Sequence, residues 1–155
     1  MRAIKRSRKF EDLVRKLADV HHPTTGKSVF PTIRELMCFA AVLGFENDRR
    51  KKLQNETNDV DARTVEKSQQ TQDLIYLISL AAEKDVEILR DENEERMYQI
   101  FEEYAEGGFE ILEQWMREKS DDAHGDEAIL TAFSKYKLLE RDVDPEFAIG
   151  EISFS

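Results

Sequence analysis

Cations that could contact a polyanion are concentrated in the first third of the chain. Residues 1–52 hold 13 Lys and Arg against 6 Asp and Glu, whereas residues 53–155 hold 10 against 27. The basic set consists of Arg2, Lys5, Arg6, Arg8, Lys9, Arg15, Lys16, Arg49, Arg50, Lys51 and Lys52. Clustered Lys and Arg bind phosphates with an affinity that depends on salt and little on base sequence. The asymmetry therefore predicts a basic edge for DNA phosphates; the alternative is that the two halves attract one another.

Residue types that could bind a metal or act as a nucleophile are few and unfavourably spaced. The three histidines are His21, His22 and His124, and none belongs to a recognisable zinc-binding spacing. The single cysteine, Cys38, lies in an apolar segment where a thiolate would be costly, so we expect a small core residue. The sequence predicts no metal, no cofactor and no enzyme activity, and disfavours an unrecognised hydrolase.

A short buried helix over residues 32–44 is predicted to be the centre of the fold. Thr32 and Glu35 have the spacing of a capping box at its start, and Gly44 is expected to close it. Every residue from 36 to 43 is apolar, which is typical of a helix buried on all sides. The segment is too short to span a bilayer, and no apolar run of about 18 residues occurs elsewhere. No membrane partner is expected.

Apolar periodicity predicts further helices over about 10–17, 68–83, 85–89, 91–119 and 126–138. The fourth is the longest, and Asp91 with Glu94 is expected to form its capping box. Gly107-Gly108 in its middle predicts a close approach by another helix, because the apolar stripe continues across it. Its glutamates are expected on the solvated face, namely Glu102, Glu103, Glu106, Glu110 and Glu113.

The predicted architecture is all-α, a single compact bundle of five to six helices with a non-helical C-terminal tail. Residues 1–9 are expected to form a basic arm, residues 10–139 the helical domain and residues 140–155 the acidic and apolar tail. Residues 46–64 are polar and are interpreted as a surface loop. No segment has a convincing strand period. A basic N-terminus without an apolar core segment, together with the lone cysteine, predicts a cytoplasmic protein.

The tail offers a second kind of interface. Phe147, Ile149, Ile152 and Phe154 are apolar among acidic residues. They could dock on a partner as an extended peptide, or fold back over the chain's own body.

Three segments resemble a known family. They are residues 30–45 (FPTIRELMCFAAVLGF) followed by Arg49-Arg50, residues 73–81 (DLIYLISLA), and residues 89–92 (LRDE) together with 100–112 (IFEEYAEGGFEIL). Over residues 8–118 the chain resembles the DNA phosphorothioation (Dnd) system-associated protein 4 family. The resemblance implies a bacterial, cytoplasmic accessory in DNA modification, restriction and anti-phage defence, acting near DNA with other proteins of the system. It carries over no catalytic residues.

Two functions therefore stand as hypotheses. The first is a non-enzymatic accessory that contacts the DNA backbone through the basic edge. The second is an adaptor or regulator of a larger defence protein, with the acidic long helix and the tail as its interface and no direct DNA contact.

Overall fold

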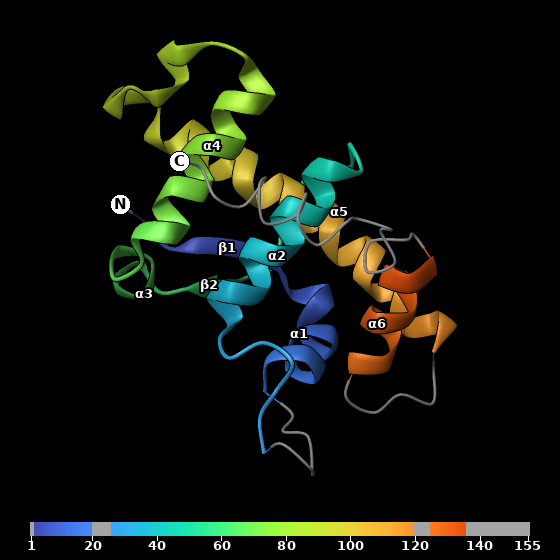
Figure 1. The fold of residues 1–155 in the computed structure, drawn as a ribbon. Coiled ribbons are helices and arrows are strands. Elements are labelled where there is room, and N and C mark those ends of the chain that lie inside the picture. Colours follow the sequence, from blue (N-terminus) through green and yellow to red (C-terminus); the bar gives the residue numbers. More distant parts are fainter. Residues whose placement is uncertain (1, 20–25, 120–124, 136–155) are drawn as a thin grey trace, which may run out of the picture.

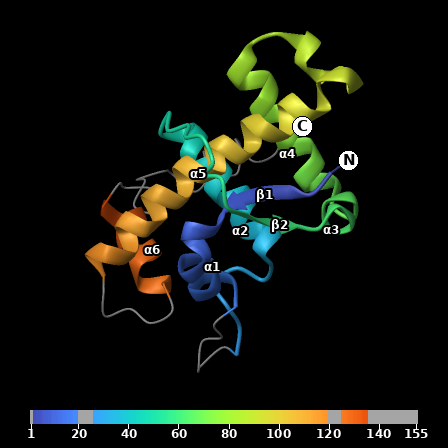
Figure 2. The ribbon, with the colours of Figure 1, turned by 180° about the vertical axis from the view of Figure 1, so that it is seen from behind.

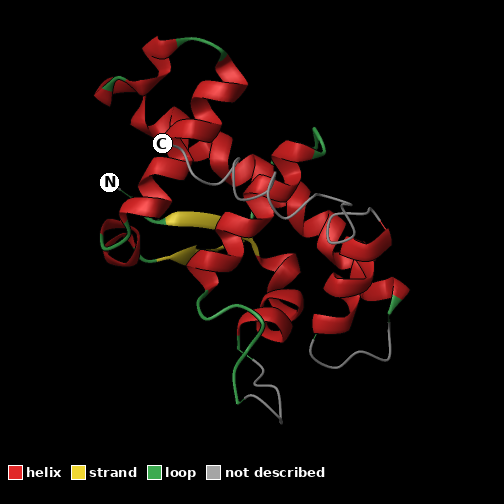
Figure 3. Cartoon of the chain, viewed as in Figure 1, coloured by secondary structure: helices red, strands yellow, loops and turns green. Residues whose placement is uncertain are grey.

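The computed structural model describes residues 2–19, 26–119 and 125–135, with side chains to residue 132. In chain order the elements are β1 (Ile4–Ser7), η1 (Arg8–Phe10), α1 (Glu11–Ala18), α2 (Ile33–Glu46), β2 (Thr57–Val60), α3 (Ala62–Glu66), α4 (Gln69–Glu83), η2 (Val86–Leu89), η3 (Asp91–Asn93), α5 (Glu94–Glu118) and α6 (Asp126–Lys135). Helices dominate the described chain, so the all-α prediction is confirmed, with a small two-stranded sheet added (Figures 1 and 3). The tail with Phe147, Ile149, Ile152 and Phe154 lies outside the described residues.

The core is organised by the crossing of α2 and α5, the most extensive contact between two elements. Three glycines make this crossing possible. A Cβ on Gly44 would overlap the backbone oxygen of Tyr104, and one on Gly108 would overlap that of Ala40. A Cβ on Gly107 would overlap the oxygen of Arg49, just beyond the end of α2. The prediction that the glycine pair allows close packing is confirmed, and α5 crosses in front of α2 in Figure 2 as an unbroken helix.

Helix α2 begins as predicted and ends later. The Glu35 N–H donates to Thr32 Oγ1 at 3.1 Å, which confirms the cap. Gly44 does not close the helix: it lies within α2 at the crossing, and the left-handed residue is Asp48, with φ 50°. The expectation of burial on all sides is also only half right. The face toward α5 is buried, but Val42 on the other side is exposed.

Strands β1 and β2 correct two predictions at once. The segment expected as a basic arm is β1, and β2 lies inside the expected loop 46–64, followed directly by α3. They pair antiparallel, with Ile4 opposite Val60 and Ser7 opposite Thr57. Each strand has four residues and is largely polar, so neither offers the alternating pattern by which strands are recognised.

The starts of α4 and α5 differ in how well the sequence predicted them. Ser68 caps α4 by accepting the Thr71 N–H, which agrees with the expected boundary. The capping box at the start of α5 is wrong. Asp91 belongs to η3, and α5 begins at Glu94 after Asn93, whose side chain makes no cap hydrogen bond.

Candidate nucleic-acid interface

The outer edge of β1 is capped by two carboxylates from α5. The Lys5 N–H donates to Glu102 Oε2 at 2.5 Å, and the Ser7 N–H donates to the Glu106 carboxylate. The two glutamates are four residues apart in α5, a rise of about 6 Å along the helix axis. The two amides are two residues apart in β1, a rise of about 6.6 Å along the strand. The two spacings are nearly equal, so the glutamates can accept from alternate strand amides. Glu102 and Glu106 are 4% and 2% exposed. The expectation that they line the outside of α5 is wrong, because they take the place of a third strand.

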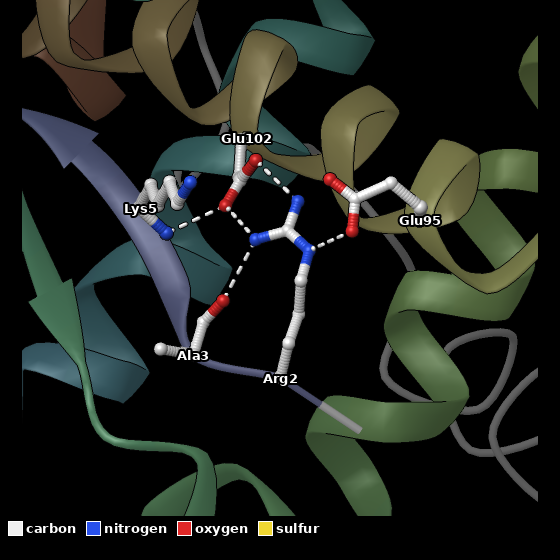
Figure 4. Close-up of polar contacts among 5 residues, drawn as sticks. All are labelled: Arg2, Ala3, Lys5, Glu95 and Glu102. Carbon is white, nitrogen blue, oxygen red and sulfur yellow. Dashed lines mark hydrogen bonds and ion pairs between the residues drawn. The ribbon is translucent and has the colours of Figure 1, made fainter.

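Glu102 is held by Arg2 in a bidentate pair. Arg2 Nη1 and Nη2 each lie 2.8 Å from a Glu102 oxygen, and Arg2 Nε lies 2.8 Å from Glu95 Oε2 (Figure 4). The guanidinium also stacks over the Tyr98 ring, 5.0 Å from its centroid. Burial raises the pKa of Glu102, although Arg2 and the Lys5 N–H both favour its ionised form. The start of the chain is therefore clamped to α5.

Glu106 is held without a cation in contact. Ser7 Oγ–H donates to Glu106 Oε2 at 2.6 Å, and Ser7 Oγ in turn accepts the Gln54 N–H at 2.9 Å. Glu106 Oε1 is buried and has no hydrogen-bond partner in the described structure. Burial raises the pKa of Glu106, opposed by the Ser7 hydrogen bonds and by the charge of Lys9. Through Ser7, Glu106 links β1 to the segment that precedes β2.

Two more predicted phosphate-binding residues face inward. Arg6 is 5% exposed, and its Nη2 donates to Glu11 Oε2 at 3.0 Å. Burial would raise the pKa of Glu11, but hydrogen bonds from Asn58 and Arg6 lower it overall. Arg50 Nε donates to Glu103 Oε1 at 2.8 Å. The Arg6–Glu11 pair lies within residues 1–52, but the pairs that Arg2 and Arg50 make with α5 show that the two halves of the chain do attract one another.

The remaining cations divide between two places. Five cations of β1, η1 and the segment after α2 stay exposed. We call them the outward cations: Lys5, Arg8, Lys9, Lys51 and Lys52. Arg15 and Lys16 lie on α1, where Lys16 lines a separate hollow with Glu113 of α5. Arg49 is partly buried, with its carbonyl against Gly107. The predicted basic edge is therefore narrower than the sequence suggested.

Two neighbouring hollows bring four of the five outward cations together. One of about 580 Å³ is lined by Arg8 and Lys9, and one of about 440 Å³ by Lys5 and Lys52 together with acidic residues of α5. Gln54 and Asn55 line both hollows. Sequence analysis missed these two amides, because isolated polar residues in a polar segment carry no signal. Their shared position makes the hollows one continuous polar strip.

The described residues show no gathering of metal ligands: no three His, Cys, Asp or Glu side chains among them lie close enough to hold an ion. His21, His22 and His124 lie outside the described ranges. Cys38 Sγ lies 3.6 Å from Thr71 Oγ1, and burial raises the pKa of its thiol. Across residues 2–19, 26–119 and 125–135, no helix has the length and apolar character needed to cross a bilayer.

Comparison with protein-family models identifies the family of the chain. The model of the family described as DNA sulphur modification system-associated protein 4 matches residues 3–148. The chain belongs to this family. The match includes β1 and the whole α2–α5 crossing, so it covers the outward cations together with Arg6 and Arg50, whereas Arg2 lies just outside it. No curated protein and no solved structure matches it significantly.

Proposed function

We propose that this protein is a non-enzymatic accessory of a DNA sulphur modification system that contacts the DNA backbone through the outward cations. It would act in the bacterial cytoplasm as part of anti-phage defence. Other proteins of the system are its expected partners. The observation that carries the proposal is the placement of Lys5, Arg8, Lys9 and Lys52 around one polar strip, with the exposed Lys51 next to Lys52 in the chain.

The chemistry of the strip favours phosphate over bases. Lys and Arg supply charge, and side-chain amides supply neutral donors of the kind that contact phosphate oxygens. The described residues that line the two hollows include no aromatic ring, so stacking with unpaired bases has no support. The expected ligand is duplex backbone, bound with little sequence preference.

The test is fluorescence anisotropy with a short labelled duplex over a salt series. The informative variant is K5E/K51E/K52E, because these side chains are exposed and their loss leaves the clamps of Arg2 and Arg50 intact. We expect wild type to bind with micromolar affinity. The logarithm of its association constant should fall with the logarithm of salt concentration, with a slope of about 0.9 per phosphate contacted. The variant should not bind. R63E/K67E, which reverses two exposed cations near α3, is the matched control and should bind normally.

Absence of wild-type binding at low salt would reject direct DNA contact. Equal weakening by the control variant would show that overall charge, and not the strip, governs binding. Cleavage or nicking of the duplex by the purified protein would contradict the non-enzymatic role.

An adaptor role is the second candidate, and one observation supports it. Exposed apolar side chains concentrate on α4 and η2, where Leu77 and Val86 are 62% and 69% exposed. This is not the face expected from the sequence, since Glu102 and Glu106 of α5 are buried under β1.

A further inference from the structure

Exposed apolar side chains lie on α4 and on η2, at the end of the molecule formed by η2 and η3. Leu77 and Ala81 lie one turn apart on the solvent side of α4, which ends at the left-handed residue Lys84. The chain then folds η2 back against α4. Val86 and Leu89, at i and i+3 of η2, share one face of this 3₁₀ turn, and both are exposed. This end lies beyond α4, away from α6 (Figure 1).

Buried residues hold this surface in place without covering it. Ile88, between the two exposed residues, is 8% exposed and belongs to the core. The Glu87 N–H donates to Asp85 Oδ1 at 3.0 Å, and Asn93 Nδ2 donates to the Glu87 carbonyl at 2.7 Å. The turn is thus fixed by local hydrogen bonds, so its apolar side chains are presented to solvent on a defined backbone.

The surroundings of this surface are acidic. Residues 83–95 hold seven Asp and Glu against two Lys and Arg. Some of this charge is matched, since Glu87 pairs with Arg90 at 2.6 Å and Glu83 with Arg96 at 3.1 Å. Asp85, Asp91 and Glu92 are exposed and make no ion pair with the described residues. An exposed apolar patch with a charged rim is typical of a protein-binding site.

We propose that the surface formed by Leu77, Ala81, Val86 and Leu89 docks a basic segment of another protein of the DNA sulphur modification system. The segment places apolar side chains on Val86 and Leu89, and its Lys or Arg residues meet Asp85, Asp91 and Glu92. Burial of the two η2 side chains supplies the hydrophobic part of the affinity, at about 25 cal/mol per Å² removed from water. The acidic rim selects basic over acidic partners and speeds association. This inference rests on family membership and not on DNA contact by the outward cations.

The test measures binding of the purified proteins of the system, one at a time, to immobilised full-length chain by biolayer interferometry. We expect one of them to bind, and V86D/L89D to weaken that binding at least tenfold. The variant D91N/E92Q, which keeps the apolar pair, should weaken it less and flatten its salt dependence. L130D is the matched control, because Leu130 on α6 is also exposed, at 55%, and should leave binding unchanged.

Peptides tiled across the bound protein then identify the segment, and the one that competes should carry both apolar and basic residues. Three results would overturn the proposal: no binding by wild type, equal weakening by L130D, or a competing peptide that is neutral or acidic. Self-association of the wild-type chain that V86D/L89D abolishes would assign the surface to a second copy instead. Thermal unfolding of each variant, expected within a few degrees of wild type, shows that lost binding does not reflect lost folding.

Discussion

Neighbouring cations of this chain face opposite ways and do different things. Arg2, Arg6 and Arg50 point inward and pair with carboxylates. Lys5 and Lys51, each one residue from an inward cation, are exposed. The difference follows from geometry in β1, where successive side chains alternate between the two faces of a strand.

The comparison shows that attraction between the two halves and contact with a polyanion do not exclude one another. Arg2 and Arg50 fix the start of β1 and the segment after α2 to the acidic helix α5, and Arg6 pairs with Glu11 of α1. The outward cations are left in place by that same arrangement. Net charge alone could not separate the two sets, because every cation adds the same single charge to the excess in residues 1–52, whichever way its side chain points.

The largest effect is expected when an inward pair is broken. Glu102→Ala removes the partner of Arg2 and the acceptor of the Lys5 N–H together. Removing one member of a largely buried ion pair costs about 3 kcal/mol or more. Urea unfolding followed by circular dichroism should therefore show a fall in unfolding free energy of this order.

The matched change on the outward side is Lys52→Glu. Exposed substitutions change stability by about 0.5 kcal/mol or less, so its unfolding midpoint should stay near that of wild type. A loss of stability as large as that of Glu102→Ala would show that the two sets are not separate.

A smaller loss of stability is expected when the α2–α5 crossing is disturbed without any change of charge. Gly107→Ala places a Cβ against the Arg49 carbonyl, next to the segment that carries Lys51 and Lys52. Overpacking costs about 1–3 kcal/mol, offset by about 1 kcal/mol of gained helix propensity. We expect a net loss of about 1 kcal/mol together with weaker duplex binding. Unchanged anisotropy with this loss of stability would show that the outward cations do not depend on the crossing.

The elements with a strong local pattern could be predicted from the sequence. The Thr32 cap, the Ser68 start of α4 and the close packing at Gly107-Gly108 all depend on residues near one another in the chain. The strands could not be predicted, because four largely polar residues become a strand only by pairing with a partner 50 or more residues away. Tertiary pairing decided the conformation.

The same reason explains which site residues were misplaced. Glu102 and Glu106 belong to a polar stripe that predicts solvent, and the strand that covers them was itself unpredictable. Arg6 and Lys5 are equivalent in a list of charges and differ only once β1 exists. Long-range pairing is therefore the information that a single sequence lacked, for the fold and for the site alike.

One expected effect has the opposite sign. Glu106 differs from Glu102 because its contacts are a hydroxyl and an amide, and one oxygen has no partner in the described structure. Glu106→Gln keeps an acceptor for Ser7 and removes the buried charge. Because burial disfavours the charged form of this carboxyl, we expect the variant to be more stable than wild type at pH 7.

The raised pKa of Glu106 also predicts how stability depends on pH. A pKa that burial raises means that folded Glu106 holds its proton more tightly than the unfolded chain does. Its favourable contribution is complete below the unfolded value of about 4.3, and is lost as the pH rises through the folded value. Wild type should therefore lose stability relative to Glu106→Gln between pH 4 and pH 7 in parallel urea titrations. A constant difference between wild type and Glu106→Gln across this range would mean that folding leaves the pKa of Glu106 unshifted and would contradict the expected effect of its burial.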